Sequence, residues 1–301
     1  CLGVRLPLAA HRRVSKGERF SLGLSIQTPD PTKNPFERRI ITKGKDWIPV
    51  VLDSTIIPGS VCDFSAQVPH DAPAGKHGWI VSSGENFEFE GMPNVPQRFY
   101  GNNLGHDLPL SSRDGARRLA GELLKNGYNA VRLHYWDYVM TANTKDGTTI
   151  PDDRLLAFDG FMKEMIDAGI YVATDLFTTR AVPYRAIGID RDGMVPMDDF
   201  KQLVLAYDPA VSNLEEYVRQ LLTHVNPLTG HDYAHEPALA WYCLVNEGNA
   251  GDFGTKLMDE FDCFQDAWKQ WLAARRQSDS RYANIPDEMP TSVYDESING
   301  V

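Results

Sequence analysis

The sequence lacks the features that would place it in several common protein classes. Its four cysteines include no Cys-x-x-Cys pair, so neither a zinc site nor a disulfide framework is indicated. No window approaches the roughly 18 apolar residues of a membrane span, and no signal peptide is visible. The net charge of −11 argues against a nucleic acid partner, because phosphates demand a basic face. A neutral or cationic small molecule remains open as a partner.

Residues 1–95 show the two-residue period of β-strands and no helical period. Apolar Phe20, Leu22, Leu24 and Ile26 alternate with polar or small residues. Further short candidate strands, separated by turns that contain Pro and Gly, cover residues 47–52, 61–68 and 76–82. We therefore predict an N-terminal β-sandwich of roughly five to seven strands, which ends near residue 95.

After residues 91–96, a stretch with two prolines, strand and helix patterns alternate through residues 96–301. The first helix should begin near Arg113 with Ser111 or Ser112 as its N-cap, and the third with a capping box of Ser212 and Glu215. The alternation is typical of βα units with a parallel sheet. The predicted strands cover residues 97–100, 129–135, 170–177 and 238–247.

The fourth of these strands is an apolar run that ends abruptly in Asn246 and Glu247. Pro237 precedes it and Gly248 follows it, which is the punctuation of a short buried strand. In parallel α/β folds the chemistry gathers at the carboxyl ends of the strands. Asn246 and Glu247 are therefore candidate site residues, although Glu247 could instead cap the next helix or face water.

The second and third strands deliver more polar groups to the same end of the sheet. Side chains alternate along a strand, so Arg132 and His134 share one face, and Asp175 should lie on the same face of its own strand. Arg132 and Asp175 could form a buried ion pair that supports the fold, or Arg132 could contact a substrate directly. Three aromatic residues at this rim would suit the faces of sugars, which stack on rings: Tyr135, Trp136 and Phe177.

Five pieces in the right order make residues 98–250 resemble the (βα)8 glycoside hydrolases of clan A, close to the family 5 cellulase-like members. The pieces are Phe99-Tyr-Gly-Asn-Asn-Leu104, Gly127-Tyr-Asn-Ala-Val-Arg-Leu-His134, Gly169-Ile-Tyr-Val172, Asn226-Pro-Leu-Thr-Gly230 and Leu244-Val-Asn-Glu-Gly248. The β-sandwich in front is similar to accessory domains that precede such barrels. The expected fold is thus a multidomain one, a β-sandwich at residues 1–95 followed by part of a TIM barrel at residues 96–301.

The resemblance also implies roles for individual residues. Glu247 corresponds to the general acid/base on strand four, and Asn246 to the neighbour that binds the sugar 2-hydroxyl. Arg132 and His134 match positions that shape the subsite around the nucleophile. Asn102, in the first matching piece, joins Trp136 and Asp175 among the expected substrate-binding residues. No metal and no cofactor is expected.

The sequence departs from the family pattern in one important respect. The nucleophile of the family is a glutamate on strand seven, and only four βα units are recognisable here. A full barrel takes about 250 residues, more than the stretch from Gln97 to Val301 contains. We therefore expect the accessory domain and the first half of the barrel of a longer enzyme. Phe177 stands where relatives often carry a histidine, which leaves the substrate preference open.

The leading hypothesis is a retaining glycoside hydrolase that acts on a β-linked polysaccharide or oligosaccharide. The competing hypothesis is a carbohydrate-binding or scaffold protein that keeps the sugar subsite but has no nucleophile. A flavodoxin-like sheet is a weaker third possibility, because no Gly-rich phosphate turn follows the first strand of the α/β part. An extracellular or cell-envelope location is expected. Cys1 could be a lipid anchor or simply a trimmed start, and the oligomeric state stays open.

Overall fold

The computed structural model of this chain describes residues 44–45, 55–67, 71–248 and 260–289. The chain divides into two compact units after Ser54, and the second unit contains almost all of the described residues. The strands expected around Phe20 to Ile26 and at residues 47–52 lie outside the described residues. The β-sandwich and its boundary near residue 95 therefore stay predictions.

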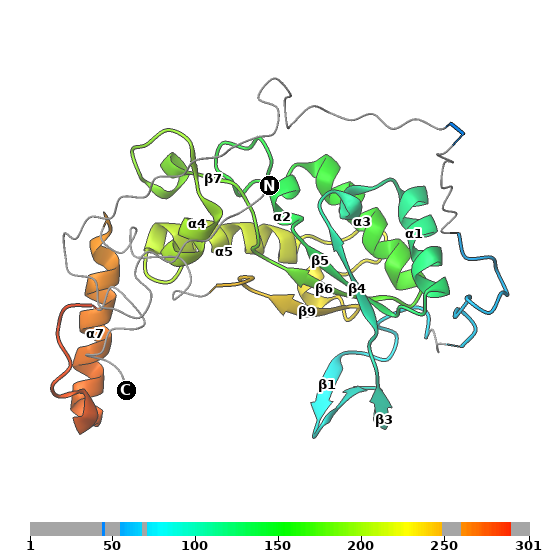
Figure 1. Cartoon of the computed structure of the whole chain (residues 1–301), viewed down its shortest axis with the longest axis horizontal. Helices are drawn as coiled ribbons and strands as arrows, with labels where there is room; N and C mark the ends of the chain where they lie inside the picture. The colour runs from blue at the N-terminus through cyan, green and yellow to red at the C-terminus, as the bar shows by residue number, and fades with distance from the viewer. Residues whose placement is uncertain (1–43, 46–54, 68–70, 249–259, 290–301) are drawn as a thin grey trace. The chain divides into compact units, whose positions relative to one another are not determined.

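A parallel sheet of four strands organises the second unit (Figure 1). Its order is β4 (Gly101–Gly105), β5 (Ala130–His134), β6 (Tyr171–Asp175) and β9 (Leu239–Cys243). All three pairings are parallel. Three of the four strands begin within one residue of the expected positions, so the prediction of an α/β fold with a parallel sheet is confirmed.

The first strand of this sheet begins four residues later than expected. Gln97 is instead the last residue of β3 (Met92–Gln97), and Phe99 places its ring edge-on against Trp241 at 4.8 Å. The backbone N–H of Tyr100 donates to the Asn129 side chain at 2.7 Å, so the ladder with β5 starts only at Gly101. Phe99, the apolar residue of the expected strand at 97–100, is therefore part of an aromatic cluster.

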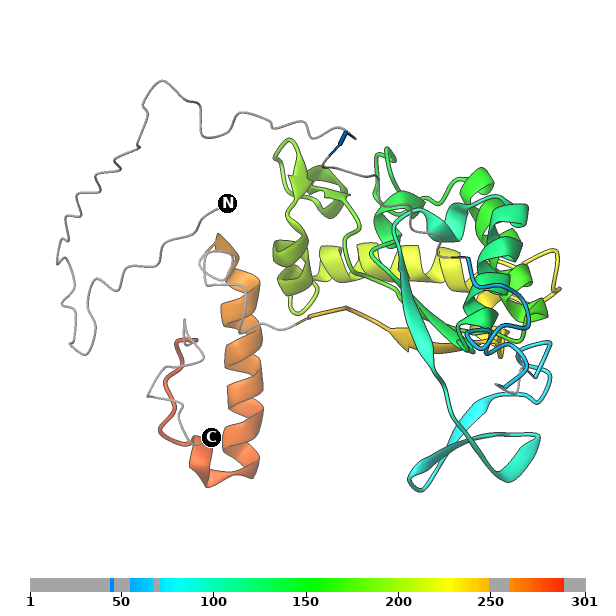
Figure 2. The same cartoon turned by 45° about the vertical axis from the view of Figure 1, so that its right-hand side comes forward.

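An antiparallel sheet of three strands precedes β4, and Figure 2 shows β4 running on from it. It consists of β1 (Ile80–Ser83), β2 (Asn86–Phe89) and β3. Phe89 of β2 is buried and stacks on Tyr171 of β6 at 5.3 Å, so the two sheets share one hydrophobic core. The strand expected at residues 61–68 is wrong. Residues 61–67 form turns, where the Asp63 carboxylate accepts hydrogen bonds from Gly59 and Ser65.

Three long helices follow the first three strands of the parallel sheet. They are α1 (Arg113–Lys125), α3 (Asp152–Asp167) and α5 (Asp208–Thr223), and α1 and α3 lie side by side (Figure 1). Ser112 caps α1 as predicted, since its hydroxyl accepts a hydrogen bond from the N–H of Gly115. The expected start of α5 at Ser212 is wrong, because the helix begins four residues earlier, where Pro209 suits the first helical turn.

Shorter elements fill the connections. Long connections follow β5 and β6. The shorter elements are η1 (Leu108–Leu110), α2 (Asp137–Met140), β7 (Val182–Pro183), η2 (Tyr184–Ile187), β8 (Met194–Val195), α4 (Met197–Leu203), η3 (Tyr233–His235) and η4 (Ser280–Tyr282). A fourth long helix, α7 (Asp262–Ser278), follows β9. The connection after β6 builds a second hydrophobic core around Phe177, Val182 and Phe200.

Glu164 of α3 joins α1 to α3 through a buried carboxylate. It accepts a hydrogen bond from Arg113 at 2.7 Å and two from Arg117 at 3.0 and 3.1 Å. Burial alone would raise the pKa of Glu164, but the two guanidinium groups outweigh burial and hold the pKa below its ordinary value of 4.5. The folded protein therefore prefers the ionised form of this side chain more strongly than the unfolded chain does.

We expect Glu164→Gln to lower the free energy of unfolding at neutral pH by about 1–2 kcal/mol, the lower part of the range for charged hydrogen bonds, because both arginines face solvent. The depressed pKa stabilises the protein above pH 4.5, and this contribution is lost as the pH falls through the folded-state value. Urea denaturation at neutral and acidic pH should show the difference between wild type and variant shrinking with acidity.

Glu216→Gln is the matched control for this experiment. Glu216 also pairs with an arginine, Arg219, but on the exposed surface of one helix, where such pairs contribute little. Its substitution should change stability by no more than about 0.5 kcal/mol. An equal effect of the two substitutions would contradict the special role of Glu164.

Candidate functional site

The carboxyl ends of β5, β6 and β9 bring the predicted polar residues together. Val131 and Leu133 of β5 are buried in the main core, which leaves Arg132 and His134 on the opposite face. The register places Arg132 beside Ala173 of β6, and Asp175 follows on the same face. The arrangement of the side chains therefore follows from strand alternation.

Asp175 is the centre of a hydrogen-bonded network on this face. Its side chain is 1% exposed and accepts three hydrogen bonds of 2.9–3.1 Å from the Arg132 guanidinium. It also bonds to Nδ1 of His134 at 2.5 Å and accepts a hydrogen bond from the Thr178 hydroxyl at 3.3 Å. The expectation that Asp175 binds substrate needs correction, because its carboxylate oxygens are buried and already bonded to Arg132 and His134. It supports the residues around it.

Arg132 links this network to the turn after β9. The guanidinium nitrogen Nη2, which donates to Asp175, also donates to Oδ1 of Asn246 at 2.8 Å. The backbone N–H of Asn246 donates to the carbonyl of Phe177 at 2.9 Å, which ties the turn to the end of β6. Because Oδ1 is held by Arg132, the Asn246 amide group Nδ2 is directed elsewhere, and it has no hydrogen-bond partner among the described residues. Arg132 is 38% exposed, so it can also contact a ligand.

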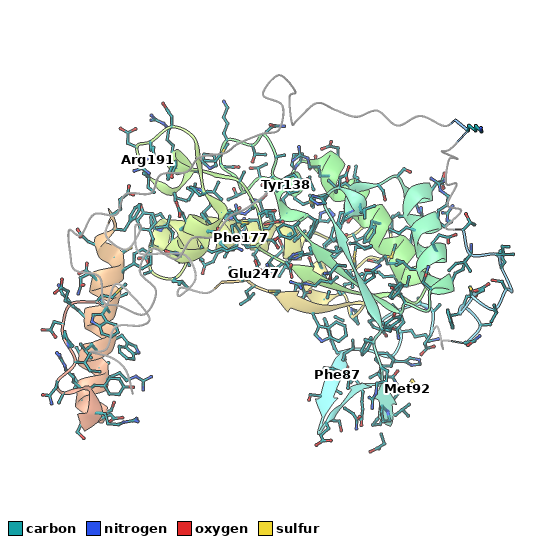
Figure 3. The ribbon with its side chains drawn as sticks, viewed as in Figure 1. Phe87, Met92, Tyr138, Phe177, Arg191 and Glu247 are labelled. Carbon is teal, nitrogen blue, oxygen red and sulfur yellow. The ribbon has the colours of Figure 1, made fainter. Side chains whose placement is uncertain are left out.

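Glu247 follows Asn246 with a backbone φ of +52°, a left-handed conformation that is uncommon for residues other than glycine. Its side chain is 66% exposed, and its Oε2 lies 3.9 Å from Nζ of Lys201 in α4. Figure 3 labels Glu247 and Phe177 at the same edge of the parallel sheet. Strained residues of this kind cluster at functional sites, where the surrounding structure holds them. Glu247 is thus an accessible carboxyl group in a constrained position.

Two of the expected aromatic contacts with a sugar need correction. Trp136 is 0% exposed, donates from its indole nitrogen to the Thr174 hydroxyl at 3.0 Å, and stacks on Phe158 at 4.7 Å. The cause is Tyr135, whose φ of +53° interrupts the alternation and turns the next side chain into the core. Phe177 is also fully buried, stacked on a phenylalanine of α4. Of the three rings, Tyr135 stays at the rim.

Asn102 also needs correction as a substrate-binding residue. The register pairs Asn102 with Val131, whose side chain is buried in the helix-covered core, so Asn102 lies on the opposite face from the site. Asn103 pairs with Arg132 and shares the face of the site. The expectation for Asn102 comes only from the piece Phe99–Leu104 that resembles the family, without a strand register. The correct register would have identified Asn103.

Asp137 anchors the turn after β6 that carries Phe177. Its buried carboxylate accepts backbone hydrogen bonds from Thr178, Thr179 and Arg180 at 2.8–3.0 Å. Burial raises the pKa of Asp137, while the hydrogen bonds from these three residues oppose the rise. The sequence signals of Asp137 and Lys201 are weak, because both lie in connections without periodicity. The structure adds both residues to the surroundings of the site.

The site is rich in proton-transfer groups, and metal-binding clusters are absent from the described part of the chain. No group of three or more His, Cys, Asp or Glu residues there could hold a metal ion. No helix in residues 55–67, 71–248 or 260–289 has the length and apolar character that crossing a membrane requires. A pocket of about 330 Å³, lined by Lys76, Lys163, His231 and Glu236, lies at the amino end of the sheet and contains none of the site residues.

No family model and no curated protein matches the chain. Among solved structures, it is similar to an endo-1,4-β-mannanase from Rhizomucor miehei, with 17% identity, a TM-score of 0.43 and coverage of 67% of this chain and 58% of that one. A glycoside hydrolase family 5 mannosidase from the same organism has 11% identity, a TM-score of 0.44 and coverage of 66% and 53%. An endo-β-1,4-mannanase from Thermotoga petrophila has 15% identity, a TM-score of 0.33 and coverage of 62% and 42%. The chain thus spans about half the length of these structures.

Proposed function

We propose that the chain carries the acid/base half of the active site of a retaining glycoside hydrolase that cleaves a β-linked polysaccharide or oligosaccharide. One observation carries the proposal. The partly buried Arg132–Asp175 pair holds the amide of Asn246 immediately before an exposed carboxyl group, Glu247, at the carboxyl end of a parallel strand. The motif around these residues, which resembles clan A hydrolases, supports the same assignment.

In the proposed reaction Glu247 first acts as a general acid. Its proton passes to the glycosidic oxygen, which leaves with the electron pair of the broken C–O bond. The resulting carboxylate then accepts a proton from the water that hydrolyses the glycosyl–enzyme intermediate. Nδ2 of Asn246 is suited to donate a hydrogen bond to the 2-hydroxyl of the sugar, because Arg132 holds the other end of the amide. Such a bond strengthens in the transition state.

The second carboxyl group, the nucleophile, must lie about 5–5.5 Å from the acid/base in a retaining enzyme. Asp175 is unsuited to this role, since Arg132 and His134 occupy its oxygens and the side chain is buried. A nucleophile from later βα units is therefore part of the proposal. A binding protein without a nucleophile is the competing function, and it shares every described residue of the site.

The complete gene product should hydrolyse β-1,4-linked glucan or mannan oligosaccharides, and the first product should keep the β-configuration at its new anomeric carbon. Proton NMR of the product immediately after cleavage reports this configuration before mutarotation. An inverted product would contradict the retaining mechanism. Oligosaccharide binding by calorimetry without any cleavage would favour the binding protein.

A further inference from the structure

Lys201 is a charged residue buried beside the candidate acid/base. It lies in α4, its side chain is 1% exposed, and its ammonium is 3.9 Å from the Glu247 carboxylate. The positive charge of Lys201 also affects the pKa of the nearby Cys243 thiol. Burial and Asp175 raise the pKa of this thiol, whereas Arg132 and Lys201 oppose the rise. The positive charge of Lys201 therefore acts on the face of the sheet where the site lies.

The fold fixes Lys201 in this place through its neighbour in α4. Phe200 is fully buried and stacks on Phe177 at 4.9 Å. The carbonyl of Phe177 in turn accepts the backbone hydrogen bond of Asn246. Two contacts thus connect α4 to the turn that carries Glu247. A movement of α4 would displace the ammonium relative to the carboxylate.

Burial of an ammonium group is costly unless a carboxylate or other acceptors compensate it. A long lysine side chain would normally extend into water, whereas here it extends into the protein toward an exposed glutamate. Glu247 also has a strained backbone conformation, which persists only where neighbouring contacts hold it. The ammonium of Lys201 and the carboxylate of Glu247 are therefore placed to interact with each other.

We propose that Lys201 is a positioning residue for Glu247, which holds its carboxyl group toward the scissile bond and stabilises the negative charge that appears there during proton transfer. This inference rests on the proposed function. When Glu247 gives its proton to the leaving oxygen, it changes from a neutral acid to a carboxylate. A fixed cation beside the group that becomes negative favours the transition state over the ground state.

Lys201→Met tests the proposal, because methionine fills a similar volume without the charge. The loss in kcat/KM should be about tenfold to a hundredfold on natural glycosides, less than the full value of general acid catalysis. On aryl glycosides with very good leaving groups, kcat/KM should fall less than threefold, since such leaving groups depart without a proton. Lys201→Arg should recover part of the activity. Equal losses on both substrate types would overturn the proposal.

Lys163→Met is the matched control. Lys163 also pairs with a carboxylate, Asp167, but in α3 on the helix surface. Its substitution should change kcat/KM by no more than twofold on either substrate type. The Lys201→Met variant should fold, because methionine buries no charge and water can solvate the exposed Glu247 carboxylate. A loss with Lys163→Met as large as that with Lys201→Met would overturn the assignment.

A double-mutant cycle separates this inference from the proposed function, because it needs no activity. The shifts in urea midpoint caused by Lys201→Met and Glu247→Gln should not add in the double variant if the two side chains interact. Additive shifts would overturn the pairing. Non-additive shifts would support the pairing. If Glu247→Gln at the same time left the glycosidase activity unchanged, the acid role of Glu247 would be refuted.

Discussion

Glu247→Gln should reduce kcat/KM on natural β-glycosides by about 10²–10⁴-fold in the complete enzyme, the usual contribution of general acid catalysis. Glutamine keeps the shape of the side chain but cannot donate the required proton. The Glu247 side chain is exposed, and glutamine keeps an acceptor oxygen near the buried Lys201 ammonium. The loss should shrink for aryl glycosides with very good leaving groups, which depart without protonation. Parallel kinetics on natural and activated substrates measure the difference.

Asn246→Ala is the informative comparison for this variant. Its hydrogen bond to the 2-hydroxyl would strengthen at the transition state whatever the leaving group, so both substrate types should lose activity to a similar extent. The two substituted residues are neighbours in the same turn. A general disturbance of that turn would affect both variants alike, so it would not explain a difference between them. Equal losses of Glu247→Gln on natural and activated glycosides would remove Glu247 from the acid role.

The sequence was sufficient to predict the strands that carry the site, because their signals are local. β5, β6 and β9 are short apolar runs that follow a helix stop or a proline, and their starts were correct within one residue. β4 was misplaced, since Gly101 and its asparagine neighbours have low β-propensity and pair only because β5 offers them a partner. A tertiary contact of this kind has no signature in the segment itself.

The network of Arg132 and Asp175 was predictable because alternation alone places both side chains on one face. Trp136 was not, since the left-handed backbone of Tyr135 ends the alternation and the next side chain lies in the core. Lys201 lies 46 positions before Glu247 in an aperiodic connection, so nothing in its neighbourhood links the two. Periodicity therefore identified the part of the site on strands, and only the fold shows the part on connections.

Asp175→Leu should be the most destabilising single substitution in the site. It removes the carboxylate that compensates Arg132 and holds His134, and the broken buried pair should cost toward the lower end of about 3–5 kcal/mol. The lower end applies because Arg132 is partly exposed to water. Urea denaturation should show the midpoint falling without a change in slope. A loss below about 1 kcal/mol, the range of surface pairs, would show that the network contributes little.

Arg132→Met combined with Asp175→Leu separates stability from function. Replacing both charges by apolar groups removes the uncompensated guanidinium, so the double variant should be more stable than Asp175→Leu alone. Recovery should be incomplete, because Oδ1 of Asn246 then loses its donor at a cost of about 1–3 kcal/mol.

Activity should not recover with stability in this double variant. Without Arg132 the Asn246 amide is no longer held in one orientation, and a misplacement of about 1 Å can cost 10²-fold in rate. The double variant should therefore fold well and still lose about that factor on natural and activated glycosides alike. If it instead regained wild-type kcat/KM, Arg132 would be a structural residue only, and the orientation of Asn246 would depend on the backbone bond to Phe177.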